Sequence, residues 1–258
     1  MLHLRFWALL VLLLLTHTAS RPARRPTLYL IGDSTVRNGA GKGADRMWGW
    51  GSFLAEHFDT TRIRISNQAI GGRSSRTFLT EGRWGNILHT LQPGDYVLMQ
   101  FGHNDGGPVN DTLRARGTLK GIGPETEDIR NLLTQQAETV HTYGWYMRRY
   151  VADTKARGAT PIVCSLVPRN VWQGGRVQRN AADYAGWAAA VAKSENAYFI
   201  DLNERVARQY DALGDEQQLK ATYFVQDHTN EAGARLNAAT VVQGIRDLKK
   251  CPLRKYLR

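Results

Sequence analysis

The sequence predicts a three-layer α/β/α sandwich around a central, parallel, five-stranded sheet. Two observations support this fold class: five short runs are almost continuously apolar, and helical patterns fill most of the intervals between them. A strand that helices cover on both faces needs near-continuous apolarity and not alternation. Right-handed crossovers then join the strands into a doubly wound sheet. The 258 residues contain no visible repeat and no Pro/Ser-rich linker, so we expect one sizeable domain.

The expected elements follow from these patterns in chain order. The strands are predicted at 27–31, 63–66, 96–101, 161–167 and 197–202. The helices are predicted at 48–58, 83–90, 137–158, 183–195 and 231–247. Thr229 or Asn230 is suited to cap the last helix, and Glu231 favours its positive end. The Gly/Pro-rich segment 102–125 is long for a loop, which indicates a functional insertion or a lid.

The N-terminus has the layout of a secretory signal peptide, with a lightly basic start, a Leu-rich run and a small-residue end. The run from Phe6 to Leu15 is shorter than the roughly 20 residues that span a bilayer. We therefore expect cleavage after Ser20 and a secreted or periplasmic protein, with an uncleaved anchor as the alternative. The predicted division is a signal peptide at 1–20, a basic linker at 21–26, one domain at 27–250 and a basic tail at 251–258.

The net charge of +11 suits an anionic partner. The Arg and Lys residues are scattered, and export argues against nucleic acid, so an acidic polysaccharide is the expected partner. The alternative is that the charge serves only solubility.

Two cysteines do not make a disulfide framework. Cys164 lies in the apolar run "PIVCSLV" and Cys251 in the basic C-terminal segment. Export permits a bridge between them, but a thiol in the strand core is the expected role of Cys164. No Cys/His cluster has zinc spacing, and no metal or other cofactor is expected.

Four polar motifs fall at one edge of the predicted sheet. "GDST" follows the first strand, "GGRSSR" the second and "GHND" the third, while "QDHTN" precedes the last helix. In a doubly wound sheet, ligands bind beyond the carboxyl ends of the strands. The four motifs are therefore expected to meet over one site.

These motifs contain the parts of a serine esterase. Ser34 is a nucleophile if a base accepts its proton, although a Ser here can also cap the following segment. An oxyanion needs several fixed donors, and the Ser34 N–H, the Gly72 N–H and the Asn104 amide can supply them. Each motif alone would more often be a turn.

The same residues resemble a known family. "GDST", "GGRSS" and "GHND" are similar to the first three conserved blocks of the SGNH (GDSL-type) hydrolases, and "GDSTVRNG", "NQAIGGRSSRTF" and "QFGHNDGG" resemble the rhamnogalacturonan acetylesterases within it. The resemblance implies a flavodoxin-like fold and a metal-free serine esterase that removes acetyl groups from pectin backbones. It also implies Ser34 as nucleophile, with Ser34, Gly72 and Asn104 forming the oxyanion hole.

The last block departs from the family's Asp-x-x-His pattern. In "TYFVQDHTNEAGA", one register makes His228 the base and puts Val225 at the acid position. The other makes Asp227 the acid and puts Asn230 at the base position. His228 is the expected base because asparagine cannot accept the proton. Asp227 is the candidate acid if the loop bends; otherwise a backbone carbonyl orients the ring.

Four residues near the motifs are candidates for substrate binding. Guanidinium groups pair with carboxylates and aromatic faces stack on sugars; ordinary ion pairing and packing are the alternative. The candidates are Arg73, Arg76, Arg169 and Trp172.

The expected function is that of a secreted, monomeric carbohydrate acetylesterase acting on an acetylated acidic polysaccharide, with rhamnogalacturonan preferred. Nucleic acid and, after signal cleavage, membranes are not expected partners. Two alternatives stay open: a GDSL esterase or lipase of broader specificity, and a catalytically impaired polysaccharide-binding relative.

Overall fold

The computed structural model describes residues 24–258, so the predicted signal peptide and half of the predicted linker lie outside the described residues. Five parallel strands form the central sheet in the order β2-β1-β3-β6-β9. This confirms the predicted fold class, and the order is the flavodoxin-like one. The strands are β1 (Thr27–Gly32), β2 (Arg64–Asn67), β3 (Tyr96–Gln100), β6 (Thr160–Cys164) and β9 (Tyr198–Ile200).

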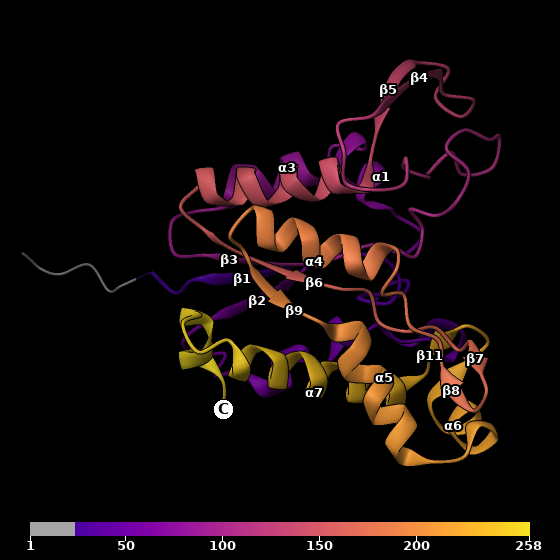
Figure 1. Ribbon diagram of the computed structural model, residues 1–258. Helices are drawn as coiled ribbons and strands as arrows, with labels where there is room; N and C mark the ends of the chain where they lie inside the picture. The colour runs from indigo at the N-terminus through magenta and orange to yellow at the C-terminus, as the bar shows by residue number, and fades with distance from the viewer. Residues whose placement is uncertain (1–23) are drawn as a thin grey trace, which may run out of the picture.

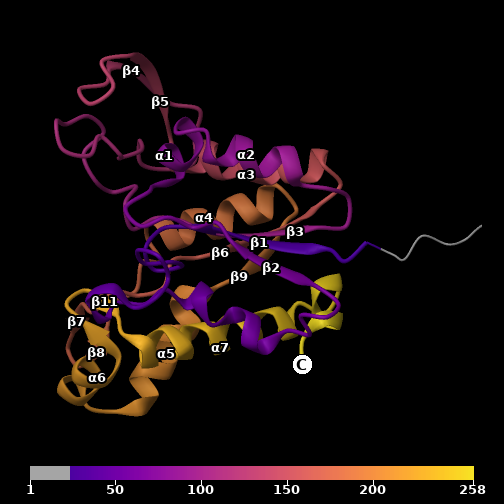
Figure 2. The same ribbon diagram turned by 180° about the vertical axis from the view of Figure 1, so that it is seen from behind.

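Helices cover both faces of the sheet (Figures 1 and 2). One face carries α1 (Ser75–Thr80), α2 (Arg83–Thr90), α3 (Tyr143–Ala156) and α4 (Tyr184–Ser194). The other carries α5 (Leu202–Leu213) and α7 (Glu231–Asp247), with the short α6 (Glu216–Tyr223) beside α5.

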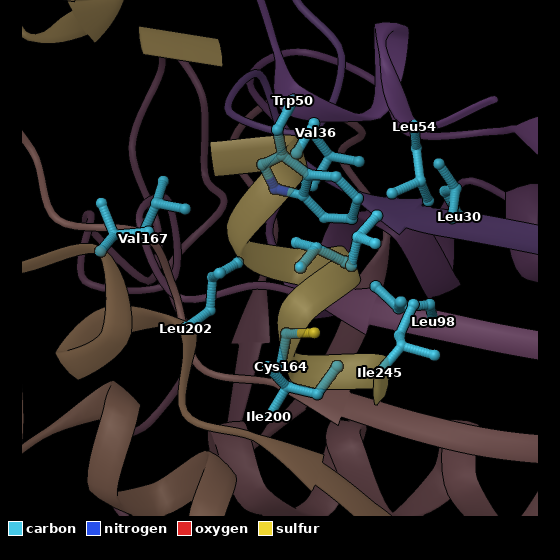
Figure 3. Packing of buried hydrophobic residues seen from close by; sticks show 14 of the residues in the cluster. Leu30, Val36, Trp50, Leu54, Leu98, Cys164, Val167, Ile200, Leu202 and Ile245 are labelled. Carbon is cyan, nitrogen blue, oxygen red and sulfur yellow. The ribbon is translucent and has the colours of Figure 1, made fainter. Parts of the chain in front are cut away.

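Two buried clusters explain why the strands are almost continuously apolar. Leu28 and Leu30 of β1 pack into the cluster under α5 and α7, whereas Tyr29 and Ile31 pack into the cluster under α3 and α4. Successive side chains of a strand point to opposite faces, so both sets are apolar. Figure 3 shows the first cluster, where Leu30, Leu98 and Cys164 lie close to α7.

The predicted helices at 83–90 and 231–247 coincide with α2 and α7. The prediction of an α-helix at 48–58 was wrong, and the helix predicted at 137–158 begins later, as α3. Residues 48–58 form the 3-10 turns η2 (Trp50–Ser52) and η3 (Leu54–His57) in place of an α-helix, and a further 3-10 turn, η1 (Ala44–Arg46), precedes them. Residues 137–141 instead pair with residues 126–130 as a strand, and α3 begins after Thr142, whose side chain accepts a hydrogen bond from the Trp145 N–H.

Three small hairpins lie at the carboxyl edge of the sheet, which is on the right in Figure 1. The hairpin of β4 (Thr126–Arg130) and β5 (Ala137–His141) projects beyond the sheet. The hairpins β7 (Trp172–Gln173) with β8 (Arg176–Val177), and β10 (Phe224–Val225) with β11 (His228–Thr229), lie near α6 in both views.

The C-terminal residues 251–258, which the sequence analysis assigned to a basic tail, pack onto the domain. Residues Pro252–Tyr256 form the 3-10 helix η4, Leu253 is fully buried, and Leu257 makes a β-bridge with Phe58. Cys164 and Cys251 are both buried free thiols. Between residues 24 and 258, no helix is long and apolar enough to cross a membrane.

Candidate active site

Ser34 lies in the tight turn that follows β1. The N–H groups of Val36 and Arg37 both donate to the carbonyl of Asp33, at 3.1 and 3.0 Å. The Asp33 carboxylate accepts from the N–H and the hydroxyl of Thr35, each at 2.8 Å. The turn is therefore fixed from within, and the Ser34 side chain, in a residue that is 8% exposed, is held at the carboxyl edge of the sheet.

The Gly71–Gly72 turn packs directly against Ser34. A Cβ added to Gly71 would stand 3.6 Å from the Cβ of Ser34. Gly72 has a φ of +80°, which glycine adopts without steric cost. Within residues 24–258, the Ser34 N–H and the Gly72 N–H donate to no backbone acceptor. Both are therefore available to an oxygen that binds beside Ser34.

Asn104 brings a third donor to the same place. It is 3% exposed, and its amide donates one hydrogen bond to the carbonyl of Arg73 at 2.9 Å. The amide carries two N–H bonds, so the second remains for a ligand. The loops of Ser34, Gly72 and Asn104 thus offer three donors, the kind of set that an oxyanion hole requires.

Asp105 fixes two of these loops relative to each other. Its carboxylate accepts from the N–H of Gly102 and from the N–H of Ser75, each at 3.0 Å, and also from the Ser75 hydroxyl. Burial raises the pKa of Asp105 to about 7, although the Ser75 hydrogen bonds act in the opposite direction. The "GHND" loop and the start of α1 are therefore one rigid unit.

His228 reaches Ser34 from the β10–β11 hairpin. Its Nε2 lies 2.8 Å from Ser34 Oγ. Val225 pairs with His228 across the hairpin, and Gln226, in the tight turn between them, has a φ of +55°. Thr229 anchors the hairpin, because its hydroxyl donates to the Trp48 carbonyl at 2.9 Å.

The same tight turn brings Asp227 back onto its neighbour. Asp227 Oδ1 lies 2.5 Å from His228 Nδ1, so the bent loop that the sequence left open is present, and no backbone carbonyl is needed to orient the ring. The second carboxylate oxygen of Asp227 pairs with Arg169. Val225, at the family's acid position, is only the cross-strand neighbour of the ring.

Arg169 connects the acid to a second histidine. Its Nε donates to His103 Nδ1 at 3.2 Å. Burial, and secondarily the charge of Arg169, hold the pKa of His103 well below its usual range, so this ring is neutral. Burial is also the main cause that lowers the pKa of His228, with Arg169 acting in the same direction and Asp33 against it.

The four predicted substrate-binding residues do not share one role. Arg73 lines a hollow of about 370 Å³ that reaches Gly72, and Arg169 lines one of about 390 Å³ that reaches Gly102 and His103. Arg76 is fully buried, pairs with Glu138 and donates to the carbonyls of Val109 and Gly117. The prediction for Arg76 was wrong, because its partner comes from β5, a strand that the sequence analysis assigned to a helix.

Trp172 is also turned toward the protein. Its indole N–H donates to Asn170 at 2.8 Å and its ring packs near Tyr210. It lines neither of these two hollows, and its contacts are those of packing. In the described part of the chain, no group of three or more His, Cys, Asp or Glu side chains is placed to hold a metal ion.

Sequence analysis missed two residues at this site, Arg114 and Arg116. Both line the hollow that reaches Gly72, and Arg116 donates to the Gly72 carbonyl at 3.1 Å. They lie in the loop that was predicted to be a functional insertion, and their basic character was the available signal.

Two curated proteins that are similar to this chain are named as acetylesterases. The chain is 35% identical over 205 residues to a protein of Emericella nidulans named rhamnogalacturonan acetylesterase, covering 79% of this chain and 77% of that one. It is 32% identical over 228 residues to the probable rhamnogalacturonan acetylesterase YesY of Bacillus subtilis, covering 86% and 93%.

Solved structures share the fold. YxiM of Bacillus subtilis superimposes with a TM-score of 0.70 at 24% identity, over 90% of this chain and 59% of that one. The acetylxylan esterase Axe2 of Geobacillus stearothermophilus superimposes with a TM-score of 0.55 at 16% identity, over 85% and 93%. The model of the GDSL-like lipase/acylhydrolase family matches residues 30–236. The chain therefore belongs to the GDSL-like lipase/acylhydrolase family and is a carboxylic ester hydrolase.

Proposed function

We propose that this protein is a serine acetylesterase that removes acetyl groups from rhamnogalacturonan. The observation that carries the proposal is the hydrogen-bonded chain from Ser34 Oγ to His228 Nε2, 2.8 Å apart, and from His228 Nδ1 to Asp227, 2.5 Å apart. A serine hydroxyl becomes a competent nucleophile when an adjacent, oriented base accepts its proton. This arrangement also argues against a relative that has lost catalysis.

The reaction follows from these positions. Ser34 Oγ attacks the acetyl carbonyl carbon while His228 Nε2 takes the hydroxyl proton. The negative oxygen that forms is held by the Ser34 N–H, the Gly72 N–H and the free N–H of Asn104. His228 then gives its proton to the departing sugar oxygen, which leaves Ser34 acetylated. A water molecule, deprotonated by His228, attacks the acetyl group and releases acetate.

The pH dependence should reflect the environment of His228. The ring must be neutral to accept a proton, and its pKa is lowered from the usual value of 6.5. We therefore expect the acidic limb of kcat/KM on p-nitrophenyl acetate to have its midpoint below 6.5. Arg169→Gln should move that limb to higher pH, because Arg169 lowers this pKa. A limb above 6.5 in the wild type would contradict the lowered pKa of His228.

Two features support rhamnogalacturonan as the substrate. Both curated relatives described above are named for acetylesterase activity on it. The net charge of +11 favours association with a polymer of uronates. The apolar segment Phe6–Leu15 supports the further proposal that the protein is exported. Export would bring it to a polymer of this kind outside the cytoplasm.

Ionic strength provides the test of substrate class. We expect acetate release from acetylated rhamnogalacturonan to fall as salt rises to about 0.5 M, because salt screens attraction between exposed charges. Hydrolysis of p-nitrophenyl acetate, a neutral ester, should change little. Equal rates on acetyl and long-chain p-nitrophenyl esters, with no acetate released from the polymer, would instead favour the broader esterase or lipase.

A further inference from the structure

An arginine-rich hollow opens beside the proposed oxyanion hole. It has a volume of about 370 Å³, and its lining includes Gly72, Arg73, Arg114 and Arg116. Gly72 links the two features, since its N–H is a proposed oxyanion donor and its carbonyl accepts from Arg116 Nη1 at 3.1 Å. The guanidinium of Arg116 therefore lies against the residue that would supply an oxyanion donor. We call this the arginine hollow.

The carboxylate that lines the arginine hollow does not balance the positive charge of Arg114 and Arg116. The one acidic lining residue of the hollow, Glu81, pairs with both Arg73 and Arg83. Within residues 24–258, neither Arg114 nor Arg116 makes an ion pair with a carboxylate. The pKa of Arg116 is lowered by burial and by the neighbouring charges of Arg114 and Arg169, which outweigh the opposite effect of Asp33 and Asp105. An anion in the hollow would relieve this repulsion.

The arginine hollow is also fixed in shape before any ligand arrives. One carboxylate oxygen of Asp111 accepts from the backbone N–H groups of Leu113, Arg114 and Ala115. The buried guanidinium of Arg76 holds both ends of the 109–117 segment through the carbonyls of Val109 and Gly117, at 2.6 and 2.8 Å. Arg76 thus positions the loop that carries the two unpaired arginines.

We propose that Arg114 and Arg116 bind the carboxylate of a uronate residue in the polysaccharide, either in the acetylated sugar or in its immediate neighbour. The inference rests on the proposed function, and it names the carboxylate as the part of the substrate that the enzyme recognises. Guanidinium groups suit this task because their planar donors match a carboxylate. Leu113 and Leu133, which are 83% and 47% exposed, also line the hollow and suit the methyl group of an adjoining 6-deoxy sugar.

The test compares two forms of one substrate. Acetate release is measured on acetylated rhamnogalacturonan oligosaccharides and on the same oligosaccharides with their carboxyl groups methyl-esterified. Wild-type kcat/KM should be higher on the free acid. Arg114→Ala, at an exposed side chain, should reduce the ratio of the two kcat/KM values about tenfold, as expected for a lost charge-assisted hydrogen bond. Arg116→Gln should reduce it in the same direction.

Arg64→Ala is the matched control. Arg64 is an exposed arginine at the start of β2, the opposite end of the strand from the site, so its loss should leave the ratio at the wild-type value. If Arg114→Ala and Arg116→Gln both keep the wild-type ratio while acetate is still released, the uronate subsite is refuted and the proposed function stands. If the wild type releases no acetate from either form, the proposed function fails together with the subsite.

Discussion

Ser34→Ala should remove esterase activity and leave the fold intact. We expect kcat on p-nitrophenyl acetate to fall by at least about 10⁴-fold, the scale seen when a nucleophile is removed from a catalytic triad. The physical reason is that Oγ forms the covalent bond to the acyl group, and no other hydroxyl is bonded to His228 within residues 24–258. The loss of kcat is measured from the rate of p-nitrophenolate release, by stopped-flow or steady-state kinetics.

The structural cost of this change should be small. Alanine removes one side-chain hydrogen bond, which contributes about 1 kcal/mol to stability, so thermal unfolding by circular dichroism should remain cooperative. Ser52→Ala is the matched control: its buried hydroxyl has no hydrogen-bond partner in the described structure, and activity should be retained. Ester hydrolysis that persists in Ser34→Ala at the wild-type rate would refute the nucleophile assignment.

The sheet and the meeting point of the motifs could be predicted from sequence, since both depend on local patterns. Apart from the edge strand β2, each strand of the sheet is a largely apolar run, and parallel strands bring their carboxyl ends to one edge. The loops of the "GDST", "GGRSSR" and "GHND" motifs accordingly lie against one another, with Gly71 next to Ser34 and Asn104 bonded to Arg73. Nothing more than the order of strands and loops was needed for that inference.

What the sequence could not supply depends on partners far along the chain or on a single dihedral angle. Arg76 looked like a surface arginine near the site, but Glu138, 62 residues later, pairs with it in the interior. The reach of Asp227 to His228 depends on the positive φ of Gln226, which a non-glycine residue adopts only infrequently. Local residue preferences give no indication of either feature.

Asp227→Asn should have the second largest effect on catalysis. The Asp227 carboxylate accepts the Nδ1 proton of His228, which leaves Nε2 free to take the proton of Ser34. The negative charge also stabilises the imidazolium that forms in the transition state. An asparagine at this position lacks the charge and can hold the His228 imidazole in the wrong tautomer. We therefore expect kcat to fall by about 10²- to 10⁴-fold.

The size of that loss tests whether Asp227, directly before His228, takes the role of the acid that the family's Asp-x-x-His pattern places three residues before the histidine. Asp45→Asn, which removes the same charge from an exposed side chain, should leave kcat unchanged. Arg169 holds the second oxygen of Asp227, which fixes the carboxylate against the ring despite its exposed position. A change of less than about threefold for Asp227→Asn would mean that Asp227 is only a partner of Arg169, because a triad acid contributes far more than an exposed ion pair.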